Sequence, residues 1–262
     1  MTTSHFFLLH SAPIFLFFAG LLAGALNSVA GGGSFISFPA LLVTHMAPIA
    51  ANATSTAALW PGTVASTIAY RHELATETRK TILPLLISAF VGGLVGAQIL
   101  LHTPQSTFLR LVPWLLLSAT LLFLVSNRIT AWIRARSDQH GHSRLMTIGV
   151  ALLQLIVGIY IGYFGAGSGI MILALLSLLG ITNIHAMNGI KTLLVTVGNA
   201  VALVTFIVAK IIFWPQTVLM LAGASLGGYG GAFFAQKINP MYVRRIVIVV
   251  GFAMSLYFFI RR

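Results

Sequence analysis

The feature that most constrains this chain is a series of long apolar runs separated by short polar gaps. A helix needs about 20 apolar residues to cross the roughly 30 Å hydrocarbon layer of a bilayer. We expect eight such segments, at about 12–43, 52–70, 82–101, 108–127, 146–179, 186–207, 214–235 and 241–260. The sequence therefore predicts an all-α polytopic membrane protein.

The composition excludes several other classes of protein. Only 7% of the residues are charged, whereas soluble globular proteins carry about 25%. The absence of cysteine excludes disulfides and thiolate metal sites. The net charge of +12 would suggest nucleic-acid binding in a soluble protein, but the basic residues lie mostly between apolar runs, where membrane topology explains them. We expect a lipid bilayer as partner, no nucleic acid and no cofactor.

The first and fifth apolar segments are too long for one straight helix, and glycines interrupt both. The first contains Gly31-Gly32-Gly33, and the fifth contains Gly165, Gly167 and Gly169. Because glycine lowers helix propensity by about 1 kcal/mol per site, these segments are predicted to be broken or re-entrant. No basic region precedes the first segment, so we expect it to stay in the membrane rather than to be cleaved as a signal peptide.

An internal repeat is indicated by residues that recur at an offset of 135. The recurring residues are Gly92, Gly93, Gly96, Ala97 and Arg110, which correspond to Gly227, Gly228, Gly231, Ala232 and Arg245. Upstream of the glycine clusters the offset changes to 138, as for Gly20 and Gly158. The pattern predicts two transmembrane repeats, 12–127 and 146–260, joined by a polar cytoplasmic linker at 128–145.

The relative orientation of the two repeats stays open at this stage. Eight full crossings would make the repeats parallel, whereas re-entrant first and fifth segments would make them inverted. Both arrangements place most of the Lys and Arg residues on one side, so the positive-inside rule does not choose between them. Both place the gaps 71–81 and 128–145 in the cytoplasm.

Polar and glycine residues inside the apolar segments are the candidate substrate-binding residues. Irregular backbone at membrane depth is tolerated where it is buried in protein or lines a polar cavity, and its N–H groups can bind an anion. Close helix packing is the competing explanation for the glycines. The candidates are Asn27, Ser28, Gly31, Gly32, Gly33, Ser34, Asn52, Thr54, Ser55, Thr56, Gly165, Gly167, Ser168, Gly169, Asn188, Lys191 and Thr192.

Lys191 is the one charged residue well inside a predicted span. A charge near the bilayer centre costs about 2.5–3.5 kcal/mol on insertion scales, and no acidic residue lies within a span to pair with it. An anionic substrate is one possible partner. The alternative is that the lysine extends to the headgroups.

At these residues the chain resembles the sulfite exporter TauE/SafE family of membrane permeases. The first half contributes Gly20-x-x-x-Gly24, Asn27-Ser28-Val29-Ala30-Gly31-Gly32-Gly33, Pro39-Ala40-Leu41-Leu42 and Ala51-Asn52-Ala53-Thr54-Ser55-Thr56. The second half contributes Gly158-x-x-x-Gly162-Tyr163-Phe164-Gly165 and Ala186-Met187-Asn188-Gly189-Ile190-Lys191. The resemblance covers nearly the whole chain.

The resemblance implies a multi-pass permease of the bacterial cytoplasmic membrane, with inverted repeats and small anions such as sulfite or organosulfonates as substrates. The chain departs from the family pattern in its second half. There the glycine cluster is diluted by Ala166 and Ser168, and Ala174 stands where the first half has Pro39. These departures predict a less disrupted fifth segment.

We therefore expect a secondary transporter or exporter of a small anion, and not an enzyme. The alternative is a non-transporting membrane subunit or assembly factor, in which the glycines serve helix packing alone. A membrane-embedded enzyme ranks last, because the spans contain no pattern typical of acid–base or metal chemistry. Faces of small residues make a homodimer possible.

Overall fold

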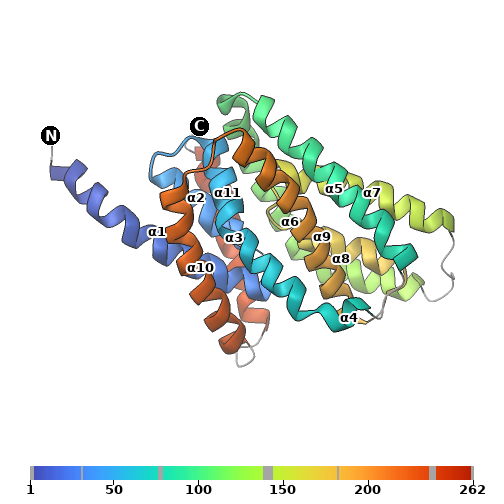
Figure 1. Ribbon diagram of the computed structural model, residues 1–262. Coiled ribbons are helices and arrows are strands. Elements are labelled where there is room, and N and C mark those ends of the chain that lie inside the picture. Colours follow the sequence, from blue (N-terminus) through green and yellow to red (C-terminus); the bar gives the residue numbers. More distant parts are fainter. Residues whose placement is uncertain are drawn as a thin grey trace. The chain divides into compact units, whose positions relative to one another are not determined.

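The computed structural model describes residues 3–30, 32–75, 79–137, 144–181, 183–235 and 240–260. It describes side chains within 13–27, 32–74, 79–122, 124–125, 146–181, 183–228, 245 and 248–260. These residues form helices and no strands (Figure 1). The helices are α1 (Thr3–Ala30), α2 (Ser34–Val43), α3 (Pro48–Ala69), α4 (Arg71–Ala75), α5 (Arg79–His102), α6 (Gln105–Ser137), α7 (Arg144–Tyr163), α8 (Ser168–Leu178), α9 (Ile184–Val208), α10 (Trp214–Ala235) and α11 (Pro240–Ile260).

Several of these helices are long and apolar enough to cross a membrane. In the described residues four stretches qualify: Arg79–His102, Gln105–Leu122, Met146–Tyr163 and Ile184–Val208. Large apolar side chains such as Leu152 and Ile156 are more than 60% exposed, which a lipid environment explains and water does not. The prediction of a polytopic all-α membrane protein is therefore confirmed, while the eight segments stay a prediction.

Both over-long apolar segments are interrupted, as the glycine clusters predict. In the first, α1 ends at Ala30 and α2 begins at Ser34. In the fifth, α7 ends at Tyr163 and α8 begins at Ser168. Each segment therefore consists of two helices rather than one continuous helix.

The second interruption is the more irregular of the two among the described residues. Gly165 and Gly167 have φ angles of 75° and 73°, a left-handed region that costs other residues about 1–2 kcal/mol. By contrast, Gly33 has a right-handed φ of −55°. Two glycines thus suffice to turn the chain even when Ala166 and Ser168 lie among them. Because Gly31 of the first break lies outside the described residues, the expectation of a less disrupted fifth segment stays a prediction.

The chain divides into two compact units that take residues from both sequence halves. Unit 1 comprises 1–62, 104–117 and 209–262, and unit 2 comprises 63–103 and 118–208. These units describe packing, and the repeat boundaries at 12–127 and 146–260 stay a prediction.

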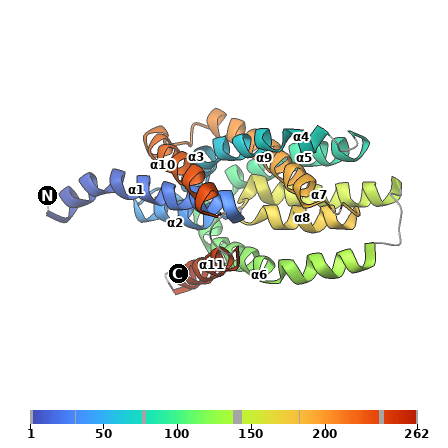
Figure 2. The same cartoon turned by 90° about the horizontal axis from the view of Figure 1, so that it is seen from below.

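In unit 1, α1 and α10 pack with their backbones in close approach (Figures 1 and 2). A Cβ atom at Gly223 would meet the carbonyl oxygen of Phe17, and one at Gly227 would meet that of Leu21. A Cβ atom at Gly24 would likewise meet the carbonyl oxygen of Ala224 in α10. Because the paired numbers rise together, the two helices run parallel.

Unit 1 also brings α2, α6 and α11 together through aromatic side chains. The ring of Phe38 lies 6.1 Å from that of Phe108 and 6.2 Å from that of Phe258, measured between centroids. The Ser255 hydroxyl donates a 2.9 Å hydrogen bond to the Pro113 carbonyl. The C-terminal end of α11 thus lies beside the first turns of α6.

In unit 2, α5 and α7 repeat the close packing of α1 and α10. A Cβ atom at Gly92 would lie 2.6 Å from the Leu155 carbonyl oxygen, and one at Gly96 would meet that of Ile159. These helices also run parallel. Gly92 and Gly96 of the recurring set therefore serve close helix packing.

The apolar core of unit 2 holds the α7–α8 break against α9. Its buried side chains come from α5, α7, α8 and α9 and include Leu85, Ala89, Val157, Ile161, Ile172, Leu176, Met187, Ile190 and Leu194. Gly93 of α5 also approaches α9, where its Cβ would lie 2.5 Å from the Gly198 carbonyl oxygen. The start of α8 and the first turns of α9 are thereby positioned next to each other.

Candidate functional site

The first group of candidate residues surrounds the start of α2 in unit 1. Gly33 is buried, and its Cβ would lie 2.8 Å from the Ala23 carbonyl oxygen and 2.9 Å from the Asn27 Cβ. No side chain caps the N-terminus of α2. Gly32 is buried and Ser34 is half-buried beside it. The structure therefore brings Asn27 to the break.

Two of the candidate residues, Ser28 and Gly31, fall outside this description. The side chain of Ser28 and the whole of Gly31 do not belong to the described residues. Their assignment to the site stays a prediction.

A chain of hydroxyl groups connects α3 to this break. The Ser55 and Ser37 hydroxyls lie 2.6 Å apart, and the Ser37 hydroxyl donates to the Gly33 carbonyl at 3.2 Å. Ser37 was not among the predicted residues, although it lies one helical turn after Gly33. A search for hydroxyls one turn beyond each break would have found it.

The other polar residues of α3 have different roles. The buried Thr54 hydroxyl accepts a 3.2 Å hydrogen bond from the Phe213 backbone N–H, so it ties the segment before α10 to α3. The Thr56 hydroxyl donates to the carbonyl of Asn52 on its own helix at 2.9 Å. Asn52 is 3% exposed. Thr54 and Thr56 thus satisfy backbone groups of the protein.

The second group of candidate residues surrounds the α7–α8 break in unit 2. Gly167 precedes α8 in a left-handed conformation, and no side chain caps this helix N-terminus. The Tyr160 hydroxyl donates a 2.6 Å hydrogen bond to the Ala166 carbonyl and so braces the turn. Tyr160 was also missed by the sequence analysis, because a tyrosine in an apolar span looks like an ordinary lipid-facing or core residue.

Lys191 lies against the start of α8. A Cβ atom at Gly169 would lie 3.2 Å from the Cδ and 3.6 Å from the Cγ of Lys191. The ammonium donates a 2.8 Å hydrogen bond to the Asn188 side-chain oxygen. Packing of α8 on α9 therefore brings the predicted residue Gly169 next to Lys191, which contacts Asn188 on its own helix.

The remaining residues of this group are close in sequence but serve the backbone. The Thr192 hydroxyl donates to the Gly189 carbonyl of its own helix at 2.9 Å. Ser168 is 3% exposed, and its N–H donates to the Gly165 carbonyl at 3.3 Å.

The second group combines groups that bind oxyanions. Helix N-termini and glycine-rich turns present backbone N–H groups and a positive dipole end to a negative ligand. Lys191 adds a full positive charge to the start of α8. The first group offers hydroxyl and amide side chains without a basic residue, so the second group is the better candidate for binding an anion.

Comparison with known proteins points to one family over nearly the whole chain. The family model described as "Sulfite exporter TauE/SafE" matches residues 16–258. A "Probable membrane transporter protein" of Haemophilus influenzae is 29% identical, with 92% of this chain and 91% of that protein aligned. The "Probable membrane transporter protein YfcA" of Escherichia coli K12 is 28% identical, with 92% and 87% aligned. No solved structure matches the chain.

Proposed function

Because this chain belongs to the sulfite exporter TauE/SafE family, we propose that it moves a small anion of the sulfite or organosulfonate class across the membrane as a secondary transporter. The chain is a multi-pass membrane transporter of the bacterial cytoplasmic membrane, and this is not an enzyme class. The choice of anion, the exporting direction and the site are the proposed parts.

The placement of Lys191 beside the α7–α8 break is the observation that carries the proposal. Its aliphatic side-chain carbons pack on Gly169. The charge is therefore held near the non-helical backbone between α7 and α8. Such backbone is tolerated in a membrane where it is buried or lines a polar path. An oxyanion passing there would meet an ammonium, the Asn188 amide and the uncapped start of α8.

The membrane potential is sufficient to drive export of such an anion. Moving one negative charge out of a negative interior gains about 2.3 kcal/mol per 100 mV. A monovalent anion can therefore leave the cell through this protein without a coupled ion.

We also propose that the two repeats are inverted, with re-entrant first and fifth segments. Contacts within unit 1 support this arrangement. The Thr54–Phe213 hydrogen bond places the segment before α10 near the start of α3, and the Ile49 N–H donates to the Gln105 side-chain oxygen at 3.0 Å. With 71–81 and 128–145 in the cytoplasm, the starts of α3 and α6 are external, so the start of α10 is external too.

A contact of α11 supports the same orientation of the second repeat. The Ser255 hydroxyl donates to the Pro113 carbonyl in the first turns of α6, and this contact supports an external end of α11. In eight full crossings, the segment before α10 and the C-terminus would instead be cytoplasmic.

Contacts within unit 2 lead to the same orientation. The Gly189 Cβ would lie 3.2 Å from the Leu74 Cγ and 3.3 Å from the Tyr70 Cβ, and the Thr67 and Thr196 hydroxyls lie 3.0 Å apart. The start of α9 therefore lies beside the cytoplasmic end of α3. A fifth segment that begins after the cytoplasmic linker and ends on the same side is re-entrant.

Backbone geometry supports the internal repeat itself. His45 and Gly180, 135 positions apart, both follow the second helix of a broken segment with left-handed φ angles of 62° and 72°. In the packed helices, Gly92 and Gly96 take the roles of Gly223 and Gly227, an offset of 131 rather than 135. We therefore align α5 with α10 one helical turn away from the match of Gly92, Gly93 and Gly96 with Gly227, Gly228 and Gly231.

Sulfite flux from proteoliposomes tests the proposed function and its site. We expect Lys191→Gln to lower flux about tenfold, because a charge-assisted hydrogen bond contributes about 1.5–3 kcal/mol. Glutamine keeps an N–H donor for the Asn188 side-chain oxygen, so we expect the variant to fold. Lys80→Gln, a change at an exposed lysine in the 71–81 gap, serves as the matched control and leaves flux unchanged.

Two results would argue against the proposal. Equal flux in Lys191→Gln and in the unmodified chain would show that Lys191 is not part of the site, although transport itself would still be supported. No flux of sulfite or of short sulfonates from folded protein favours the non-transporting subunit instead.

A further inference from the structure

Gln154 is a buried glutamine of α7 in unit 2 that the proposed transport site does not use. Its side chain is 0% exposed, and neither the nitrogen nor the oxygen of its amide has a hydrogen-bond partner among the described residues. Polar side chains inside membrane helices usually bond to a neighbouring helix, and a buried polar group without a partner destabilises the fold. Bonding between helices therefore does not account for this residue.

The face of α7 that carries Gln154 is otherwise apolar. Val150 precedes it by about one turn, and Val157 and Ile161 follow it by about one and two turns, so all of them lie on the same side of the helix. These three side chains are buried in the core of unit 2 together with side chains of α8 and α9. The amide therefore lies on the core-facing side of α7.

The corresponding position in the first half shows that packing does not require a polar residue here. At the offset of 138 that relates Gly20 to Gly158, the counterpart of Gln154 is Leu16 of α1. Leu16 is 2% exposed, so an apolar side chain of similar size fills the equivalent place. The amide of Gln154 is thus better explained by a polar ligand than by packing.

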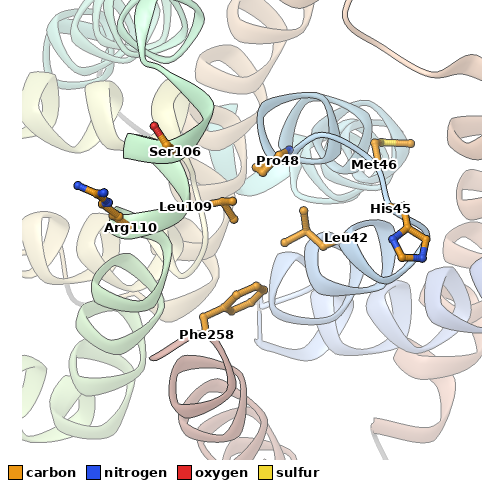
Figure 3. Close-up of a pocket in the computed structure, with 8 residues that line it drawn as sticks. All are labelled: Leu42, His45, Met46, Pro48, Ser106, Leu109, Arg110 and Phe258. Carbon is orange, nitrogen blue, oxygen red and sulfur yellow. The ribbon is translucent and has the colours of Figure 1, made fainter. Parts of the chain in front are cut away.

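The cavity shown in Figure 3 does not lead to this amide. It has a volume of about 820 Å³ and lies between the end of α2, the start of α6 and the end of α11. Its described lining residues all belong to unit 1, whereas Gln154 belongs to unit 2. Because Gln154 is fully buried, a ligand reaches its amide only when a helix of unit 2 moves.

The helix of unit 2 whose connections allow such a movement is α8. It is short, with 11 residues, and it packs beside α7 (Figure 2). Glycines connect it at both ends, with Gly165 and Gly167 before it and Gly180 after it. Movements of helices are absorbed by a few residues at element ends, often small ones. A tilt of α8 away from α7 would open the core-facing side of α7.

We propose that Gln154 is a second anion-contacting residue on the transport path, reached from the cytoplasmic side when α8 tilts away from α7. The predicted cytoplasmic linker leads directly into α7, and Gln154 lies about 15 Å along this helix from its first residue, Arg144. The amide donates N–H groups to the oxygens of sulfite or a sulfonate without adding a charge. Such a contact is weak enough for the anion to leave, as a transport path requires.

The inference rests on the proposed function and assigns a further residue to it. Cysteine accessibility tests whether water and anions reach this position, because the chain contains no native cysteine. The reagent is 2-sulfonatoethyl methanethiosulfonate, a water-soluble anion, applied to the full chain purified in a neutral detergent. We expect Gln154→Cys to react about tenfold faster than Leu16→Cys, the matched control, because a thiol that stays buried in an apolar core is inert.

Sulfite flux from proteoliposomes tests whether the amide contacts the anion. Gln154→Leu introduces the residue of the counterpart position, so we expect it to fold and to melt no lower than the unmodified chain. Its KM for sulfite rises about tenfold, because a hydrogen bond to a charged group contributes about that factor, while the maximal flux is kept. Gln98→Leu, the same change at an exposed glutamine of α5, leaves the KM unchanged.

Two outcomes would overturn the inference. One is a Gln154→Cys variant that reacts no faster than Leu16→Cys, and the other is a Gln154→Leu variant that keeps the KM of the unmodified chain. Either would assign the amide to packing or to an enclosed water alone. Absence of flux in the unmodified chain overturns the proposed function, whereas slow labelling of Gln154→Cys in a chain that transports overturns only this inference.

Discussion

At the scale of single residues, His45 adopts a backbone conformation that favours glycine. Its φ of 62° lies in the left-handed region, where a Cβ atom is crowded by the following carbonyl oxygen. Gly180 has nearly the same φ, and a Cβ atom added there would have nothing within 4 Å. Gly180 therefore isolates the conformational cost of a side chain from any packing contact.

We predict that His45→Gly stabilises the folded chain by about 1 kcal/mol and that Gly180→Ala destabilises it by about the same amount. Unfolding of the purified protein by detergent titration measures both changes. A loss of stability in His45→Gly would mean that the imidazole makes contacts worth more than the relieved strain.

The hydroxyls of α3 allow a second prediction at this scale, because they serve different partners. Thr54→Val leaves the Phe213 N–H without this acceptor in a part-buried position, which should cost about 1 kcal/mol. Thr56→Val removes only a bond to the carbonyl of its own helix and should cost less than half as much. Equal losses in thermal stability for the two variants would contradict the cross-connection between α3 and the segment before α10.

At the scale of helices, glycines decide which pairs can come into close contact. Membrane helices associate without a hydrophobic driving force between them, so small residues that allow close approach determine the partners. Glycines allow this close approach in the α1–α10 pair and in the α5–α7 pair. The neighbouring glycine of α7, Gly149, has nothing within 4 Å of its Cβ position.

We predict opposite effects for alanine at two glycines of the α5–α7 pair. Gly96→Ala places a methyl group on the Ile159 carbonyl oxygen and should destabilise the protein by about 2 kcal/mol, as overpacking does. Gly149→Ala should be neutral or stabilise it by up to about 1 kcal/mol through helix propensity. Stability measured in one detergent compares them, and a harmless Gly96→Ala would exclude the parallel packing described for unit 2.

At the scale of the whole molecule, the chain's path through the membrane is the main consequence of these contacts. Thr54 with Phe213, Ser255 with Pro113, and Gly189 with Tyr70 and Leu74 each link segments far apart in sequence. Each link agrees with inverted repeats and disagrees with eight full crossings, in which the repeats would be parallel.

Cysteine labelling tests this path directly, because the chain contains no native cysteine. We expect Ala209→Cys in intact cells to react with a membrane-impermeant maleimide, as Thr107→Cys does, whereas Lys80→Cys reacts only after the cells are opened. Protection of Ala209→Cys in intact cells would favour eight crossings.

The candidate site was predictable only in part. Gly169, Asn188 and Lys191 were predicted because a charge and clustered glycines are conspicuous in apolar segments, and packing of α8 on α9 brings them together. Ser37 and Tyr160 were missed, since a single hydroxyl in an apolar helix carries no signal until its acceptor is known. Whether the predicted residues bind an anion is a question for the flux experiment.

The class of protein and the two interruptions were predictable from the amino-acid sequence. These features depend on local properties, namely the length of apolar runs and the backbone freedom of glycine. The folded chain was needed to see which helices lie side by side, in which direction they run, and that the ends of α2 and α11 enclose a cavity with the start of α6. In a chain this apolar nearly every helix face can be buried, so pairing is decided by close backbone contacts between distant residues, which local periodicity does not contain.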